Sequence, residues 1–251
     1  MKTIYQLLII ILLTGLINCT KESAFVGGNT TGASGSTARF TTSGNYLYVV
    51  DNVSLKSFDI SNNTNPVYKS KTDIGINIET IFPYKDKLFI GSSSSMYIYS
   101  LADPARPVRI AKAEYTIRMA CDPVVAKDNV AYATLRANGS CGGGISALVV
   151  YNITDIADPK LETTIPLSGP YGLGLKDNSL YVCEGPGGIK VFNITSIYNP
   201  IPGVILTAAG TSFYDVIPYG NVLIAQVNDG FILYDLSVNP HQPTFLSRIQ
   251  N

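Results

Sequence analysis

The sequence is poor in the side chains from which most catalytic centres are built. Its 251 residues include a single histidine, His241, and no tryptophan. With one histidine the chain cannot assemble a metal site of several imidazoles, and a serine–histidine–aspartate triad has little to build on. We therefore assign no catalytic residues and no metal ligands, and we expect no cofactor.

Charge of either sign is also scarce. Charged residues make up 14% of the chain, and 18 lysines and arginines balance 18 aspartates and glutamates. A nucleic-acid-binding surface requires an excess of positive charge, so no nucleic-acid partner is expected. The chain is instead 46% hydrophobic and contains 16 tyrosines and 9 phenylalanines, a composition typical of a well-buried, strand-rich protein.

One long apolar run occurs, at residues 4–17, behind the single positive charge of Lys2. It is short for a transmembrane helix, which needs about 20 apolar residues, and is typical of a secretory signal peptide. The run ends in Leu16-Ile17-Asn18-Cys19, which resembles a bacterial lipobox, although Asn18 is larger than the residue usual there. The resemblance implies removal of residues 1–18, lipidation of Cys19 and anchoring to a membrane. The alternative is an ordinary secreted protein that is cleaved nearby.

The expected lipid anchor places the protein in the bacterial cell envelope, as an outer-membrane lipoprotein. Lys21-Glu22 directly after the cysteine resembles the surface-export signals of some bacterial groups, which would expose the protein on the cell surface. Residues 27–37 are mostly glycine, serine, threonine and asparagine, a composition typical of a flexible linker. We therefore expect a tether over residues 19–37 and a folded domain over residues 38–251.

The rest of the chain repeats one unit. An aromatic residue returns at intervals of 41, 52, 41 and 42 residues, and a proline follows eight residues after the first four copies and nine after the last. A short apolar strand and a turn rich in glycine or asparagine precede each aromatic residue. The aromatic residues are Phe58, Tyr99, Tyr151, Phe192 and Tyr234, and the prolines are Pro66, Pro107, Pro159, Pro200 and Pro243.

Each unit predicts four antiparallel strands, and four-stranded units of about 40–45 residues are typical of propeller blades. The expected fold is an all-β, five-bladed β-propeller, with blades at about 38–74, 75–117, 118–168, 169–210 and 211–251. A β-solenoid or an open array of sheets is the alternative. If Phe25 and Val26 add no outer strand, no blade is shared between the termini, and the ring must close by packing alone.

The unit also resembles the LVIVD repeat of bacterial β-propeller proteins. The residues that carry the resemblance are Gly44-Asn45-Tyr46-Leu47-Tyr48-Val49, Leu55-Lys56-Ser57-Phe58-Asp59-Ile60-Ser61 and Tyr214-Asp215-Val216. It extends over the whole chain after the tether. It implies a propeller fold in the bacterial envelope, and it implies no particular reaction.

The third unit is longer than the others because about eight residues are inserted between its second and third strands, around Arg136 to Gly144. Cys121, at the start of the same unit, and Cys141, in the insertion, are expected at the same end of the blade. Since an exported protein meets oxidising conditions, we predict a disulfide between them. Two free thiols are the alternative, and Cys183 is expected to be a buried apolar residue.

The start of each innermost strand should lie at one mouth of the central channel. The residues expected there are Arg39, Glu79, Arg118, Asp122, Tyr171, Tyr214 and Asp215. This channel mouth could bind a polar ligand such as a glycan, or its groups could only satisfy one another across a narrow channel. The sequence therefore favours a non-enzymatic module that binds an unknown protein or glycan ligand or acts as a scaffold. The alternatives are a glycan-cleaving enzyme that uses a carboxylate pair from Glu79, Asp122 and Asp215, and a purely structural envelope protein.

Overall fold

The computed structural model describes residues 35–115, 123–137 and 144–250, and this part of the chain contains strands and no helix. Twenty strands form five sheets, each of four antiparallel strands in chain order. The first two sheets comprise β1 (Phe40–Ser43), β2 (Tyr46–Val50), β3 (Ser54–Asp59) and β4 (Val67–Asp73), then β5 (Ile78–Tyr84), β6 (Lys87–Ser92), β7 (Ser95–Ser100) and β8 (Val108–Glu114). The third comprises β9 (Val124–Lys127), β10 (Val130–Leu135), β11 (Ala147–Asn152) and β12 (Lys160–Pro166). The last two comprise β13 (Leu173–Lys176), β14 (Ser179–Cys183), β15 (Ile189–Asn193) and β16 (Ile201–Leu206), then β17 (Phe213–Tyr219), β18 (Val222–Val227), β19 (Gly230–Asp235) and β20 (Thr244–Gln250).

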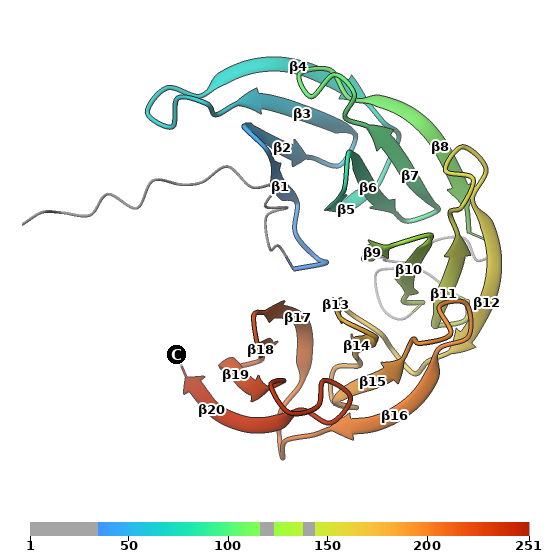
Figure 1. The fold of residues 1–251 in the computed structure, drawn as a ribbon, viewed down its shortest axis with the longest axis vertical. Helices are drawn as coiled ribbons and strands as arrows, with labels where there is room; N and C mark the ends of the chain where they lie inside the picture. The colour runs from blue at the N-terminus through green and yellow to red at the C-terminus, as the bar shows by residue number, and fades with distance from the viewer. Residues whose placement is uncertain (1–34, 116–122, 138–143, 251) are drawn as a thin grey trace, which may run out of the picture.

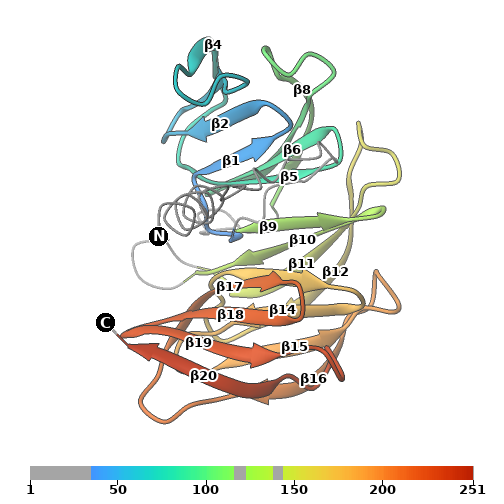
Figure 2. The same ribbon diagram turned by 60° about the vertical axis from the view of Figure 1, so that its left-hand side comes forward.

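The five sheets follow one another around an arc (Figure 1), which confirms the expected all-β propeller of four-stranded antiparallel blades. The first strand of each sheet is innermost and the fourth lies at the periphery. Figure 2 shows the last sheet from the side, with β18, β19 and β20 next to one another and the C-terminus at the end of β20. The starts of the five innermost strands, which the repeat aligns, therefore occupy equivalent positions in the five sheets.

The repeated proline sits directly before the fourth strand in all five sheets, as the sequence predicts. Proline lacks an N–H group, so it is suited to the last loop position ahead of a hydrogen-bonded ladder. The same loop begins with a polar residue whose side chain accepts a hydrogen bond from a backbone N–H group of the loop. Asn152 and Asn193 each accept a hydrogen bond from the backbone N–H two residues later, at 2.9 and 2.8 Å. The Asn-X-Thr triplets of the repeat are thus turn-forming elements.

A tyrosine of the second strand links several sheets to their successors. The hydroxyls of Tyr48, Tyr132 and Tyr181 donate to the carbonyls of Pro104, Ile197 and Pro240, at 2.9, 2.7 and 2.7 Å. Each acceptor lies in the loop between the third and fourth strands of the next sheet. We call these contacts the tyrosine links. Since the rings are fully buried between sheets, each link fixes how two blades pack.

The first and fifth sheets lie at the two ends of the arc in Figure 1. Among the described strands, none of the first sheet pairs with a strand of the fifth. Residues 35–37, which precede β1 and which we call the N-terminal strap, instead contact the fourth and fifth sheets. Ser36 Oγ donates to Asp215 at 3.1 Å and accepts from the Leu173 N–H at 2.7 Å. The end of the expected tether is therefore part of the fold.

Candidate functional site

Five of the seven residues expected at the channel mouth lie in the described part of the chain. Arg118 and Asp122 lie outside it, as do Cys19, Cys121 and Cys141, so the lipidation and the disulfide stay predictions. Arg39, Glu79, Tyr171 and Tyr214 lie just before or at the start of the innermost strands β1, β5, β13 and β17. The structure joins these four through one further residue, Arg136, and places Asp215 in a different environment.

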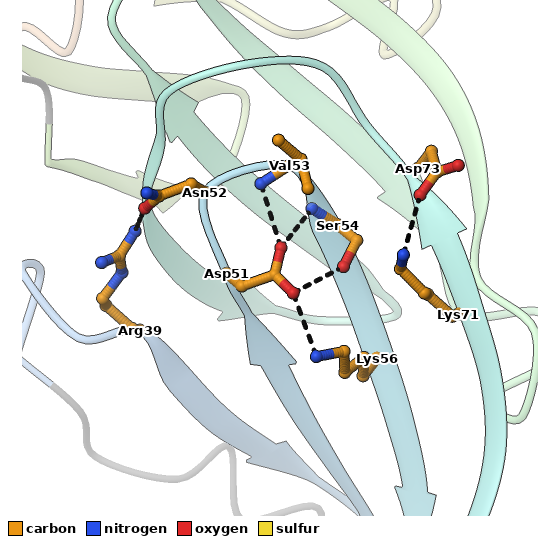
Figure 3. Close-up of polar contacts among 8 residues, drawn as sticks. All are labelled: Arg39, Asp51, Asn52, Val53, Ser54, Lys56, Lys71 and Asp73. Atoms are coloured by element: carbon orange, nitrogen blue, oxygen red, sulfur yellow. Dashed lines mark hydrogen bonds and ion pairs between the residues drawn. The ribbon is translucent and has the colours of Figure 1, made fainter.

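Arg39 is held in place by two hydrogen bonds across the first and second sheets. Its Nη2 donates to Asn52 Oδ1 at 2.7 Å (Figure 3). The same atom donates to the Ile78 carbonyl at 2.6 Å. The first acceptor belongs to the turn between β2 and β3, and the second is the first residue of β5. Arg39 therefore fixes the junction of two blades and brings a positive charge close to Glu79.

The turn that carries Asn52 is fixed by Asp51. The Asp51 carboxylate accepts from the N–H groups of Val53 and Ser54 at 3.0 and 2.7 Å, and it pairs with Lys56 at 3.0 Å (Figure 3). These contacts, the backbone N–H of Val53 first, hold the pKa of Asp51 well below its usual range. Figure 3 also shows the Lys71–Asp73 pair at 3.5 Å, in the outermost strand of the same sheet.

Glu79 is half-buried in β5 at the mouth. Burial raises the pKa of its carboxyl group, and the positive charges of Arg136 and Arg39 partly offset that effect. Arg136 belongs to the start of the insertion in the third unit and was not among the expected mouth residues. The insertion was expected on the mouth face, so its cationic residue could have been assigned there from the sequence.

Tyr171 lies between a cation and a second aromatic ring. The Arg136 guanidinium is 4.1 Å from the centroid of the Tyr171 ring, and the Tyr214 ring meets Tyr171 edge-on at 5.2 Å. A hollow of about 340 Å³ adjoins this group and is lined by Arg136, Tyr171 and Glu184 among others. The Glu184 carboxylate accepts from the Ser168 N–H at 2.7 Å and pairs with Lys190 at 2.6 Å. The mouth thus combines two aromatic rings with charged groups of both signs.

Asp215 is buried beneath the N-terminal strap. Its carboxylate accepts from Thr37 Oγ1 at 2.6 Å and from the Val216 N–H at 2.9 Å, in addition to Ser36. A side chain on Gly172 would overlap this carboxylate, so glycine is required beside it. Burial raises the pKa of Asp215 despite these hydrogen bonds. The carboxylate therefore anchors the strap, and it is not exposed to a ligand at the mouth.

The remaining candidates for chemistry have structural partners. His241 Nδ1 lies 2.8 Å from Ser179 Oγ, in a contact between the fourth and fifth sheets. Cys183 is fully buried, and burial raises the pKa of its thiol. Within residues 35–115, 123–137 and 144–250, no group of three or more histidine, cysteine, aspartate or glutamate residues is arranged to hold a metal ion. The same residues include no helix long and apolar enough to cross a membrane.

The family model of the LVIVD repeat matches residues 34–73, which correspond to the first sheet and the strap. No curated protein matches the chain. Several solved structures share its fold at low sequence identity. The computationally designed Ika8 protein aligns with a TM-score of 0.61 and 12% identity, over 84% of this chain and 60% of that one.

Two natural proteins align similarly well. The periplasmic gluconolactonase PpgL of Pseudomonas aeruginosa gives a TM-score of 0.64 and 16% identity, over 82% of this chain and 68% of its own. A functionally unknown protein of Desulfotomaculum acetoxidans gives 0.65 and 15%, over 82% of this chain and 66% of its own. The chain thus spans between 60% and 68% of the length of these structures. Together the repeat match and the shared fold establish that this chain is a β-propeller protein with an LVIVD repeat.

Proposed function

We propose that the protein is a lipid-anchored, extracytoplasmic β-propeller that binds a ligand or partner protein at the channel mouth without catalysing a reaction. The observation that carries this proposal is the cluster of Arg39, Glu79, Arg136, Tyr171 and Tyr214. These residues come from all five sheets, one from each, at positions where the copies of the repeat differ. Two aromatic rings beside charged groups of both signs form a surface suited to a polar ligand.

The described carboxylates favour binding over hydrolysis. A glycosidase of the usual kind needs two carboxyl groups that flank the scissile bond. Asp215 is enclosed by the strap, and Glu184 is paired with Lys190, so Glu79 is the described mouth carboxylate best placed to meet a substrate. Its half-buried position is the observation that supports the enzymatic alternative, together with the gluconolactonase among the proteins of similar fold.

A site-specific cross-linking experiment tests the binding proposal. A photoreactive residue replaces Tyr214 at the mouth or, as a matched control, the exposed Tyr219 at the opposite end of the same strand. The proposal predicts adducts from position 214 and none from position 219 when cells that carry the protein are irradiated. Equal adducts from both positions, or none from position 214, would contradict a binding role of the mouth.

The enzymatic alternative is tested with the purified chain. Hydrolysis of gluconolactone or release of reducing sugar from a polysaccharide panel, with loss of that activity in Glu79→Gln, would replace the binding proposal by the enzymatic one. No turnover on either substrate class is the result expected from a binding module.

The membrane anchor is tested separately. If Cys19 carries the lipid, Cys19→Ser releases the protein from the membrane fraction into the soluble fraction. We expect the variant to retain the same propeller, because Cys19 precedes β1, the first described strand. Unchanged membrane partitioning of Cys19→Ser would refute the anchor.

A further inference from the structure

A second hollow lies between the first and second sheets, at the end of the blades opposite the channel mouth. Its volume is about 690 Å³, within the range of roughly 300–1,000 Å³ that is usual for small-molecule sites. The turn between β1 and β2, with Ser43 and Asn45, forms one side together with Tyr46. The turn between β5 and β6, with Tyr84, Lys85 and Asp86, forms the other side.

The hollow is lined by tyrosines that the repeat does not require. The residue that opens the second strand is Tyr46 in the first sheet, and it is lysine, valine, serine and valine in the others. The residue directly before the turn is Tyr84 in the second sheet, and only the fifth sheet also has tyrosine there. Among the four junctions between consecutive sheets, only that of the first and second sheets has tyrosine at both of these positions.

Both rings are held in fixed orientations. Tyr46 stacks on the fully buried Tyr48, with ring centroids 6.3 Å apart and planes inclined by 20°. Tyr48 is itself fixed by its link to Pro104. Tyr84 also lines the hollow, but its ring packs on the cluster between the second and third sheets, where its hydroxyl accepts a hydrogen bond from the Asp128 N–H at 2.5 Å. Tyr46 is therefore the aromatic wall of the hollow, and a ring that is already ordered loses little conformational freedom when a ligand binds.

The rim of the hollow offers hydrogen-bonding groups of several kinds. The side chains of Ser43 and Asn45 form no hydrogen bond with any other residue that the structure describes. Lys85 lies with its ammonium group 5.0 Å from the Tyr84 ring centroid, and Asp86 pairs with Lys87 at 2.6 Å. Lys85 has a φ of 52°, a left-handed backbone conformation that is uncommon for lysine.

These groups together select one class of ligand. Lys85 disfavours a cation in the hollow beside Tyr46, Asp86 disfavours an anion, and the polar rim disfavours a fully apolar molecule. A sugar ring presents an apolar C–H face, which packs on an aromatic ring, and hydroxyls that hydrogen-bond with serine, asparagine, lysine and aspartate side chains. We propose that this hollow is a saccharide-binding site, separate from the channel mouth.

Isothermal titration of the full chain with cellohexaose, maltohexaose and hexa-N-acetylchitohexaose tests the proposal. We expect at least one of the three to bind, and Tyr46→Ala to weaken its binding by about tenfold or more, since the loss of a central aromatic contact usually costs that much. Tyr219→Ala is the matched control, because this exposed tyrosine occupies the position of Tyr84 in the fifth sheet, and it should leave the affinity unchanged.

Lys85→Gly is a second variant for the same binding measurement, which can be used if Tyr46→Ala does not fold. Glycine is favoured at this φ, so the variant should fold, and it should bind the sugar more weakly because the lysine donor is gone. Failure of all three oligosaccharides to bind would overturn the proposal. So would unchanged affinity in both Tyr46→Ala and Lys85→Gly, or a loss of affinity in Tyr219→Ala. Loss of binding only in Tyr214→Ala would assign the sugar to the channel mouth and would also overturn the site proposed for the hollow.

Discussion

Single residues that depart from the repeat carry most of the specific features of this protein. The turn between the first and second strands needs a positive φ, which Gly44 and Gly220 supply in the first and fifth sheets. Asp128 and Asp177 tolerate this conformation in the third and fourth sheets. Lys85 has the same left-handed conformation in the second sheet, although its Cβ atom makes this conformation unfavourable.

Replacement of Lys85 by glycine is therefore expected to raise the free energy of unfolding. Relief of the left-handed conformation outweighs the greater freedom of glycine in the unfolded chain, and the net gain should be about 0.5–1 kcal/mol. Thermal or urea unfolding measures this difference. A lower melting temperature for Lys85→Gly would show that the lysine side chain contributes more to the native state than its strain costs.

Asp215 gives the protein a pH dependence opposite to that of the half-buried Asp51 and Asp59. Burial raises the pKa of Asp215 above the value in the unfolded chain, so the folded state binds the proton more tightly. Its contribution to stability is therefore present at acid pH, and it is lost as the pH rises from the unfolded pKa through the folded one. Asp51 and Asp59 have lowered pKa values and act in the opposite direction.

Comparison of the wild type with Asp215→Asn isolates this effect. Both proteins share every other titrating group, so the difference between their unfolding free energies reports on Asp215 alone. We expect the wild type to lose stability relative to the variant as the pH rises above about 4, the range in which an unfolded aspartate ionises. Urea unfolding between acid and neutral pH measures it, and a difference that is constant with pH would contradict the buried, proton-binding carboxyl group.

At the scale of the strands and loops, the tyrosine links are the contacts that order one blade on the next. Three of the four junctions between consecutive sheets have such a link, and the junction of the second and third sheets has Phe89 in the same place. Phe89 is buried in a cluster that also includes Ile156, whose loop position corresponds to that of the linked carbonyls. The second strand of the fifth sheet has Ile224 there, and no sheet follows it in the arc.

Exchange of the hydroxyl between two junctions tests the role of these links. Tyr181→Phe should lower the free energy of unfolding by about 1 kcal/mol, because the Pro240 carbonyl loses its donor. Phe89→Tyr should raise the free energy of unfolding by part of that amount, because it adds a hydroxyl donor at the junction of the second and third sheets, which lacks a link. Denaturant unfolding of both single variants measures the two effects. An unchanged free energy of unfolding in Tyr181→Phe would mean that a water molecule replaces the hydroxyl as the donor to the Pro240 carbonyl.

At the scale of the whole molecule, each end sheet of the arc has one neighbouring sheet, and the N-terminal strap links the first blade to the fourth and fifth sheets. The second strands β10 and β14, in the third and fourth sheets, are buried over their whole length. In the end sheets, β2 and β18 are buried only at alternate residues, because one face of each sheet has no partner sheet. The stability of such an arc is expected to depend on contacts between nearest neighbours and to be lowest at its ends.

Hydrogen exchange of the backbone amides should reveal this gradient. We expect amides of β10 and β14 to exchange most slowly and those of β2 and β18 to exchange faster, because sheets at the ends of the arc open locally at a lower free-energy cost. Mass spectrometry or NMR under native conditions measures the rates. Equal protection of β18 and β10 would show that the fold opens only as one cooperative unit.

The sequence by itself determined the repeating parts of this protein. Strand alternation, the aromatic period and the regular proline predicted the five sheets, because these features depend on local backbone chemistry that each copy repeats. It also predicted that Arg39, Glu79, Tyr171 and Tyr214 lie at one mouth, since equivalent positions of equivalent blades must lie at the same end. Because the inserted loop of the third unit was expected at the same end, Arg136 could also have been predicted there from the sequence.

Only the tertiary structure decided how the non-repeating parts are used. The strap reads as a flexible linker by composition, yet Ser36 and Thr37 hydrogen-bond to Asp215 because the arc brings a buried carboxylate within their reach. The hollow lined by Tyr46 and Lys85 likewise depends on packing, because these residues lie in different units and line one hollow only when two blades are side by side. Contacts between residues far apart in the chain follow from the arrangement of the sheets, which no period in the sequence specifies.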